Sequence, residues 1–337
     1  MREFSRLEIN APAQSLVWID DSLYDVAAGW RRFPLDGSAA KARYSAYGPG
    51  FDAAVMSPAR DLVALLQTAG TKGLILAADG QLLREVNRSF YHAGAYRYPL
   101  ALFGMPDGRT GLVHCPAHYN QLEIEDAASG EPLTGPAKRA PAEVFHSRLA
   151  VSQSSRYLLS AGWIWQPWSC VMVYDLIAAL DNPARLDSYG DTFDMRGLIQ
   201  AEISGACFVG DDVVVSTSPE PNDPEGPDDL APNILARWSI TDRRFIWKRH
   251  LPQTAGDLLP LGDGILGLYQ HPRLYDTCTG ELAYEWPDLP TGTADSSIVW
   301  DKTFSGPARI AVDERKNRFA VTDGQRITVI TWSENAL

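Results

Sequence analysis

The sequence predicts an all-β protein, a single seven-bladed β-propeller of four-stranded antiparallel blades that occupies residues 1–337. Two observations support this fold class. Short apolar segments alternate with turn residues along nearly the whole chain, and only one short segment has a helical pattern. A hairpin signal also recurs at intervals that mostly fall near the ~40–50 residues of a propeller blade, which favours a propeller over a sandwich or barrel.

The clearest hairpin signal lies at 274–282, where a strand runs into Asp276, a Thr-rich turn, Gly280 and a second strand. Asp and Gly supply the backbone conformations that such a turn requires. Related turns stand at five earlier positions, Asp36, Asp79, Asp126, Asp175 and Asp242.

These turns divide the chain into blades at 15–47, 51–86, 99–133, 145–189, 203–249, 257–286 and 308–332. The last interval contains only three strands, which would leave an open sheet edge. We expect the N-terminal run 4–9 to supply the fourth strand and close the ring. Six blades remain an alternative count, because the first blade is weakly marked and one interval is short.

Some expected elements are less regular. The fourth strands of the third and fourth blades are expected at 131–133 and 185–189, and one or two helical turns at 175–180. An insertion at 219–230 lengthens the fifth blade; it is rich in Asp, Glu and Pro, and we expect a solvated loop there.

The repeated units resemble WD40-like and YVTN-type propellers. Tyr275-Asp-x-x-x-Gly-Glu and Glu125-Asp-x-x-x-Gly-Glu carry the resemblance, together with the inter-strand turns at 57–61 and 151–156. The Gly-His and Trp-Asp pairs of true WD40 blades do not occur as a repeated set. The resemblance implies a rigid platform for protein partners.

Charge narrows the class of partner. The formal net charge is −12, and the pI is near 5.0, which argues against nucleic acid or an anionic membrane as the main partner. A basic protein, such as a toxin or effector, would suit an acidic surface. Neither a signal peptide nor an apolar span is visible, so a cytoplasmic location is expected. The four scattered cysteines are expected to be small core residues.

Three tryptophans, Trp163, Trp165 and Trp168, lie close together between the second and third strands of the fourth blade. Pro167 argues against a continuous strand there, so at least one indole is expected at a loop surface. Exposed Trp is typical of binding hot spots, and we therefore expect these residues to contact a partner. Packing of Trp163 and Trp165 between blades is the alternative.

The insertion supplies a second candidate contact surface. Its carboxylates could bind a basic partner, although a plain solvated acidic loop is the favoured interpretation of the composition. Their spacing matches no calcium-binding loop. The candidate residues are Glu220, Asp223, Glu225, Asp228 and Asp229.

Histidines give no strong metal signal. His114 and His118 fall at a turn, where their spacing does not put both rings on one face. His146 and His271 are interpreted as structural. No metal or cofactor is expected, and no nucleophile elbow or phosphate loop is found.

The function predicted from these patterns is that of a non-enzymatic, protein-binding propeller. A narrower hypothesis is a toxin-neutralising, immunity-type inhibitor that covers an active site sterically. Two alternatives stay open: a lyase or hydrolase whose site lies in the central channel and uses His114, His118 or His146, and a structural scaffold subunit. The oligomeric state is left open.

Overall fold

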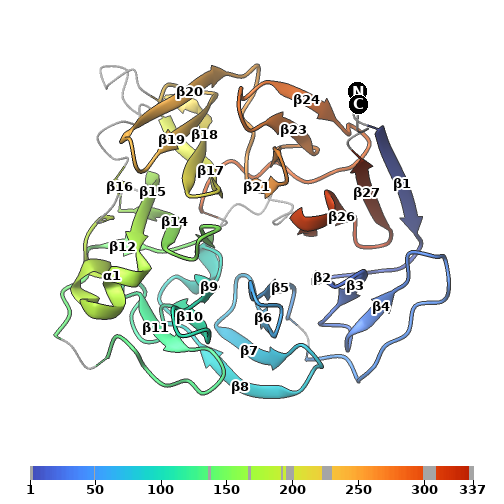
Figure 1. Cartoon of the computed structure of the whole chain (residues 1–337), viewed down its shortest axis with the longest axis horizontal. Helices are drawn as coiled ribbons and strands as arrows, with labels where there is room; N and C mark the ends of the chain where they lie inside the picture. Colours follow the sequence, from blue (N-terminus) through green and yellow to red (C-terminus); the bar gives the residue numbers. More distant parts are fainter. Residues whose placement is uncertain are drawn as a thin grey trace.

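The computed structural model describes residues 3–48, 50–135, 138–165, 168–190, 193–194, 201–221, 230–298 and 309–333. These residues form seven antiparallel sheets, which stand around a central channel as the blades of a propeller (Figure 1). The predicted all-β, seven-bladed fold is confirmed, with most blades four-stranded.

Six of the seven sheets are built from strands that follow one another in the chain, as the hairpin signals predict. The first blade consists of β2 (Leu16–Ile19), β3 (Ser22–Asp25) and β4 (Arg31–Phe33). The second consists of β5 (Ala53–Met56), β6 (Leu62–Leu66), β7 (Lys72–Ala77) and β8 (Leu82–Asn87). The third consists of β9 (Leu100–Gly104), β10 (Thr110–His114) and β11 (Glu123–Asp126).

The fourth blade has a divided first strand, because β12 (Val144–Phe145) and β13 (Leu149–Val151) both pair with β14. The rest of the fourth blade consists of β14 (Tyr157–Ile164), β15 (Trp168–Asp175) and β16 (Phe193–Asp194). The fifth blade consists of β17 (Ala201–Val209), β18 (Asp212–Pro221), β19 (Ile234–Ser239) and β20 (Arg244–His250). The sixth blade consists of β21 (Leu258–Leu261), β22 (Gly264–Gly267), β23 (Arg273–Asp276) and β24 (Leu282–Glu285).

The seventh blade is completed by the N-terminal strand, as predicted. Its own strands are β25 (Arg309–Asp313), β26 (Arg318–Thr322) and β27 (Ile327–Ser333), and β1 (Glu3–Ile9) pairs antiparallel with β27. The register runs from Phe4 opposite Trp332 to Ile9 opposite Ile327. This pairing gives the β27 edge a partner and closes the ring.

Two predicted outer strands are wrong. At 131–133 only one bridge forms, between Glu125 and Pro132, so the third blade has three strands. At 185–189 the chain forms the 3-10 helix η2 (Pro183–Asp187) after the helix α1 (Leu176–Asp181). The Asp175 side chain caps α1 by accepting from Ala178 N at 3.0 Å, and Pro183 begins η2, which favours helical turns over an edge strand. The short helix expected at 175–180 is confirmed.

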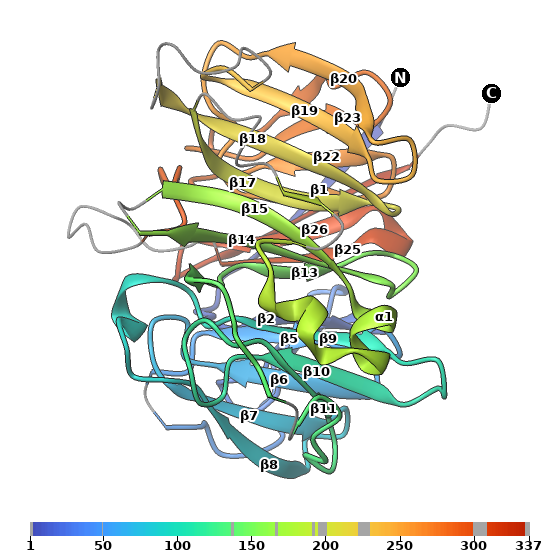
Figure 2. The ribbon, with the colours of Figure 1, turned by 90° about the vertical axis from the view of Figure 1, so that its left-hand side faces the viewer.

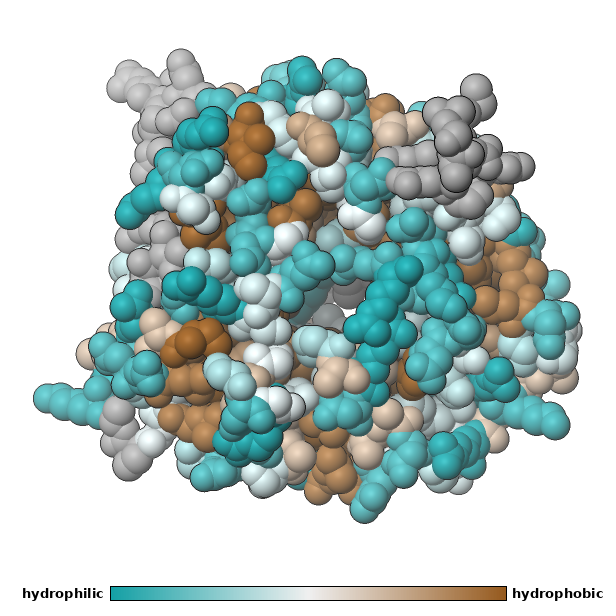
Figure 3. Space-filling model, viewed as in Figure 1, coloured by the Kyte–Doolittle hydropathy of each residue, from teal (hydrophilic) through white to brown (hydrophobic). Residues whose placement is uncertain are grey.

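The first strand of every blade faces the channel. A central cavity of about 800 Å³ is lined by residues of β2, β5, β9, β13, β17, β21 and β25, and the space-filling view shows it as a hollow in the middle of the ring (Figure 3). Antiparallel connectivity gives the ring two faces (Figure 2). We call the face with the loops between first and second strands the hairpin face. The connection face bears the loops between second and third strands and the links between blades.

Apolar side chains fill the spaces between blades, and Trp30, Trp163, Phe103 and Phe145 are among the largest buried ones. Cys115, Cys170 and Cys207 are buried free thiols as expected. Cys278 is exposed, contrary to expectation, because it lies in the hairpin turn after Asp276 and not in a strand. Within the described residues, no helix is long and apolar enough to cross a membrane.

Candidate binding surface

Aromatic side chains gather on the connection face where the third and fourth blades meet. Phe90, Tyr91 and His92 lie in the link from β8 to β9, Tyr119 in the loop from β10 to β11, and Trp165 directly after β14. We call these five residues the aromatic surface. They come from three separate segments that the ring brings together.

A buried stack supports this surface. The rings of Phe145 and Trp163 lie parallel, with centroids 3.8 Å apart and an interplanar angle of 6°. Tyr119 stacks on Phe145 with centroids 4.3 Å apart, and Trp165 meets Trp163 edge-on at 5.4 Å. Offset and edge-on aromatic pairs contribute stability beyond the area they bury, so the upper rings rest on a rigid base.

The close approach of β12 and β14 that forms the stack requires a glycine. A Cβ on Gly162 would lie 2.1 Å from the carbonyl oxygen of Phe145, which no side chain tolerates. Gly162 therefore lets the backbone before His146 lie directly against β14.

The upper residues of the aromatic surface are open to solvent. Phe90 is 85% exposed, Trp165 50% and Tyr91 46%. An open groove runs beside Phe90 and Tyr91, bounded on the other side by Pro116 and Ala117. Exposed large aromatics over a packed base are the arrangement from which binding hot spots are built.

Polar groups fix the edge of the surface. Tyr119 donates its hydroxyl proton to the Glu143 carboxylate, and partial burial together with this hydrogen bond raises the pKa of Tyr119. Below the link from β8 to β9, the Arg88 guanidinium donates to the carbonyl oxygens of Ala93 and Tyr96. It also lies over the Tyr96 ring, 4.6 Å from the centroid, so this link is anchored from beneath.

The three predicted tryptophans have different environments. Trp165 is at the surface, as expected. Trp163 is fully buried, so the expectation that it contacts a partner needs correction: its ring packs between blades and supports the residues above. Trp168 pairs with Ile164 across the β14–β15 hairpin. Because neighbouring strand positions alternate between the two faces of a sheet, these two side chains lie on the face opposite to that of Trp163. Trp168 is only partly exposed.

Of the acidic candidates, Glu220 lies exposed near the end of β18, on the connection face. Asp223, Glu225, Asp228 and Asp229 lie outside the described residues. Their proposed contact with a partner stays a prediction.

The histidines named for a channel enzyme do not meet there. His114 is buried against Glu125, with Nε2 3.0 Å from Oε1, and Nδ1 of His146 lies 3.0 Å from the hydroxyl of Ser160. None of the described residues lining the central cavity is a histidine. No group of three or more metal-ligating side chains is found among the residues that the structure describes.

Sequence reasoning missed Phe90, Tyr91, Tyr119 and Phe145. Phe90 and Tyr91 share one link, whereas Tyr119 and Phe145 lie in other segments, and their proximity depends on blade order. The run 88–98, which holds five aromatic or His residues between two strands, is the one local signal that could have indicated them.

No protein-family model and no curated protein matches the chain. Solved structures do match over almost its full length. BamB from Moraxella catarrhalis aligns with a TM-score of 0.52 at 14% identity, covering 99% of this chain and 97% of that one. A chain of a mitotic checkpoint complex aligns with a TM-score of 0.58 at 10% identity, covering 96% of this chain and 90% of that one. Virginiamycin B lyase from Staphylococcus aureus aligns with a TM-score of 0.53 at 12% identity, covering 98% of this chain and 99% of that one. At these identities the likeness shows the propeller fold alone.

Proposed function

We propose that the protein is a non-enzymatic binding propeller that holds a protein partner on the aromatic surface. The observation that carries the proposal is a pair of exposed rings, Tyr91 and Trp165, that contact the Phe145–Trp163 stack. The exposed ring of Phe90 lies next to Tyr91 in the chain. Rigid aromatic anchors lose little conformational entropy on binding and bury much apolar area. The solved structures of similar fold include a subunit of a multiprotein complex, which agrees with this class of function.

The partner is expected to present an apolar or aromatic pocket within a basic surface. The net charge of −12 would speed the approach of such a protein, and Glu220 on the same face adds a local carboxylate. A basic toxin is one protein with this chemistry. In the narrower hypothesis, the propeller neutralises it by covering its active site.

The test is a pull-down with the tagged full chain, run beside the double variant Phe90→Ala/Trp165→Ala and the control Leu282→Ala. Leu282 is 51% exposed, like Trp165, but lies in the sixth blade. The expected result is a stoichiometric protein retained by the wild type and the control, lost from the double variant, and released by raised salt. A partner that the double variant retains would contradict the proposal.

The same experiment separates the alternatives. Stoichiometric inhibition of a captured nuclease, protease or transferase would support the toxin-neutralising role. A stable complex that leaves the partner's activity unchanged would favour the scaffold subunit. Loss of binding in Leu282→Ala, with binding retained by the double variant, would place the contact elsewhere on the ring.

A further inference from the structure

We propose that the floor of the central channel is a binding site for a small organic anion with one carboxylate group and an apolar body. The site is formed by Arg97, Arg148 and Asp257 beneath an apolar well. It lies apart from the aromatic surface and does not depend on the protein-binding role.

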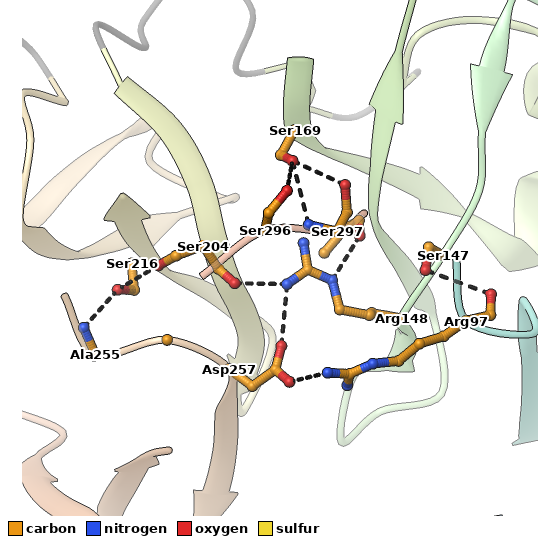
Figure 4. Close-up of polar contacts among 12 residues, drawn as sticks. Arg97, Ser147, Arg148, Ser169, Ser204, Ser216, Ala255, Asp257, Ser296 and Ser297 are labelled. Carbon is orange, nitrogen blue, oxygen red and sulfur yellow. Dashed lines mark hydrogen bonds and ion pairs between the residues drawn. The ribbon is translucent and has the colours of Figure 1, made fainter. Parts of the chain in front are cut away.

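Two guanidinium groups share one carboxylate at this floor (Figure 4). Asp257 accepts from Arg148 Nη1, with 3.0 Å between Nη1 and Oδ1, and from Arg97 Nη2 through its other oxygen. Burial raises the pKa of Asp257, but the two neighbouring guanidiniums outweigh this effect and lower it. Asp257 is therefore ionised, arginines stay protonated at neutral pH, and the cluster carries one net positive charge.

The backbone is arranged to place these three residues. Arg148 interrupts the first strand of the fourth blade and adopts a left-handed φ of +47°, which is unfavourable for a residue with a Cβ. Its Nε donates to Ala161 O at 2.9 Å and its Nη1 to Ser204 O at 2.6 Å. Asp257 follows Gly256, whose positive φ of +71° brings the backbone against Ala294.

Among the described residues, no carboxylate other than Asp257 pairs with these two guanidinium groups. The Arg148 side chain is only 8% exposed, and its Nη2 has no hydrogen-bond partner. Arg97 uses one nitrogen for Asp257, and its side chain, which is 20% exposed, lines the cavity. A buried net charge and an unpaired buried donor are both costly, so the arrangement calls for an anion.

The walls of the cavity above the floor indicate the size and polarity of the rest of the ligand. A cavity of about 440 Å³ rises from Arg97 and Arg148, a size typical of small-molecule sites. Most of its wall is apolar and comes from the first strands, for example Val55, Leu149, Val151, Leu259 and Ile310. An alkyl or aryl chain attached to the carboxylate would fill it.

The other charged groups of the cavity stand toward the hairpin face. Glu314 lies in the loop from β25 to β26 and lines the well. Arg60 and Arg315 flank it at the hairpin-face rim. At the connection face, the segment from Gly292 to Ile298 crosses from Gln270 to Tyr96, and Ser297 N contacts Ser169 Oγ at 3.3 Å. The floor is therefore approached from the hairpin face.

The test uses hexanoate and benzoate as probes, with hexanamide and benzamide as neutral controls of the same shape, titrated into the full chain by calorimetry. Both carboxylates should bind, and the amides should bind about tenfold or more weakly, because only the anion completes the charge of the floor. Equal binding of acid and amide, or no binding of either carboxylate at millimolar concentration, would overturn the proposal. Inorganic phosphate and chloride are run in parallel; if they bind as tightly as hexanoate, the apolar walls play no part and the ligand class is wrong.

Two variants locate the site. Arg97→Gln leaves Arg148 and Asp257 as a neutral pair and should weaken hexanoate binding about tenfold or more while leaving the weak hexanamide binding unchanged. Arg60→Gln at the rim is the matched control and should keep hexanoate binding, since Asp313 retains Arg318. Unchanged hexanoate affinity in folded Arg97→Gln would contradict the assignment. Should that variant not fold, the comparison of acid with amide in the wild type still decides the question.

Discussion

Trp163 and Trp165 are two positions apart, yet the fold buries one and exposes the other. Trp163 is the second-last residue of β14 and stacks on Phe145, whereas Trp165 stands just beyond Ile164, the last paired residue of the strand. The two residues therefore have different roles: Trp163 supports the base of the aromatic surface, and Trp165 is exposed on that surface, where we propose that a partner binds.

This difference should be measurable as stability. Replacing Trp163 with Ala should reduce the free energy of unfolding by about 3–5 kcal/mol, the usual effect of removing a large buried aromatic side chain. Replacing Trp165 with Ala should change it by less than about 1 kcal/mol, as for other surface positions. Urea unfolding of both variants beside the wild type gives the comparison. Similar losses for the two would show that Trp165 is also part of the core.

His146 should make stability depend on pH. Burial lowers its pKa to about 3, whereas a histidine in an unfolded chain has a pKa of about 6.5. The unfolded chain therefore binds the proton first, and stability falls as the pH drops below about 6.5. Between pH 7 and pH 5 the loss from this one residue is about 2 kcal/mol.

His146→Gln removes the titrating ring. Unfolding by urea at pH 7 and pH 5 should show a loss in the variant that is smaller than that of the wild type by about 2 kcal/mol. The carboxylates titrate in both proteins and cancel in this difference. An equal loss in both would mean that His146 is not kept neutral by burial.

At the scale of the strand and turn, the sequence was a good guide because its signals are local. Asp276 accepts hydrogen bonds from the backbone N–H groups of Cys278 and Thr279, both at 2.9 Å, and Asp126 does the same for Ser129 N at 2.8 Å. The recurring Asp is thus the physical cause of the turn. Each such turn ends one strand and starts the next, so their spacing predicts the blades.

The outer strands and the sites were harder to predict for a different reason. An edge strand is held by one neighbour only, so a capped helix can replace it, as α1 and η2 do in the fourth blade. The channel floor joins Arg97, Arg148 and Asp257 from three separate links between strands. The spacing of these residues in the sequence does not indicate the contact, because the contact follows from the order of the blades around the ring.

Gly162 gives a prediction at the scale of the element. Replacing it with Ala should force β12 away from β14, since the new Cβ would overlap Phe145 O, and the loss of unfolding free energy should exceed about 2 kcal/mol. Gly94 is the control, because a Cβ there meets nothing within 4 Å. Gly94→Ala should leave the free energy of unfolding nearly unchanged, and thermal melts of both variants beside the wild type give the comparison. A neutral Gly162→Ala would contradict the close approach.

At the scale of the whole molecule, the four thiols report whether the ring is intact. Cys115, Cys170 and Cys207 are buried and Cys278 is exposed, and burial raises the pKa of the Cys115 and Cys207 thiols. The native protein should therefore release one equivalent of chromophore quickly from a thiol-reactive disulfide reagent, and four after denaturation. In Cys278→Ser the fast phase should disappear. A second fast thiol in the wild type would show that a blade opens.

The pairing of β1 with β27 also has a consequence for how the protein is made. A ribosome produces β1 before every other strand of the ring, but its partner emerges only after six blades have been synthesised. Until then β1 is an unpaired strand with open hydrogen-bonding edges, and each blade that awaits its neighbour exposes the apolar face that the neighbour will cover. Ring closure is therefore a late event that waits for translation, and a stall before β27 would leave a chain prone to pair with its neighbours on the same polysome.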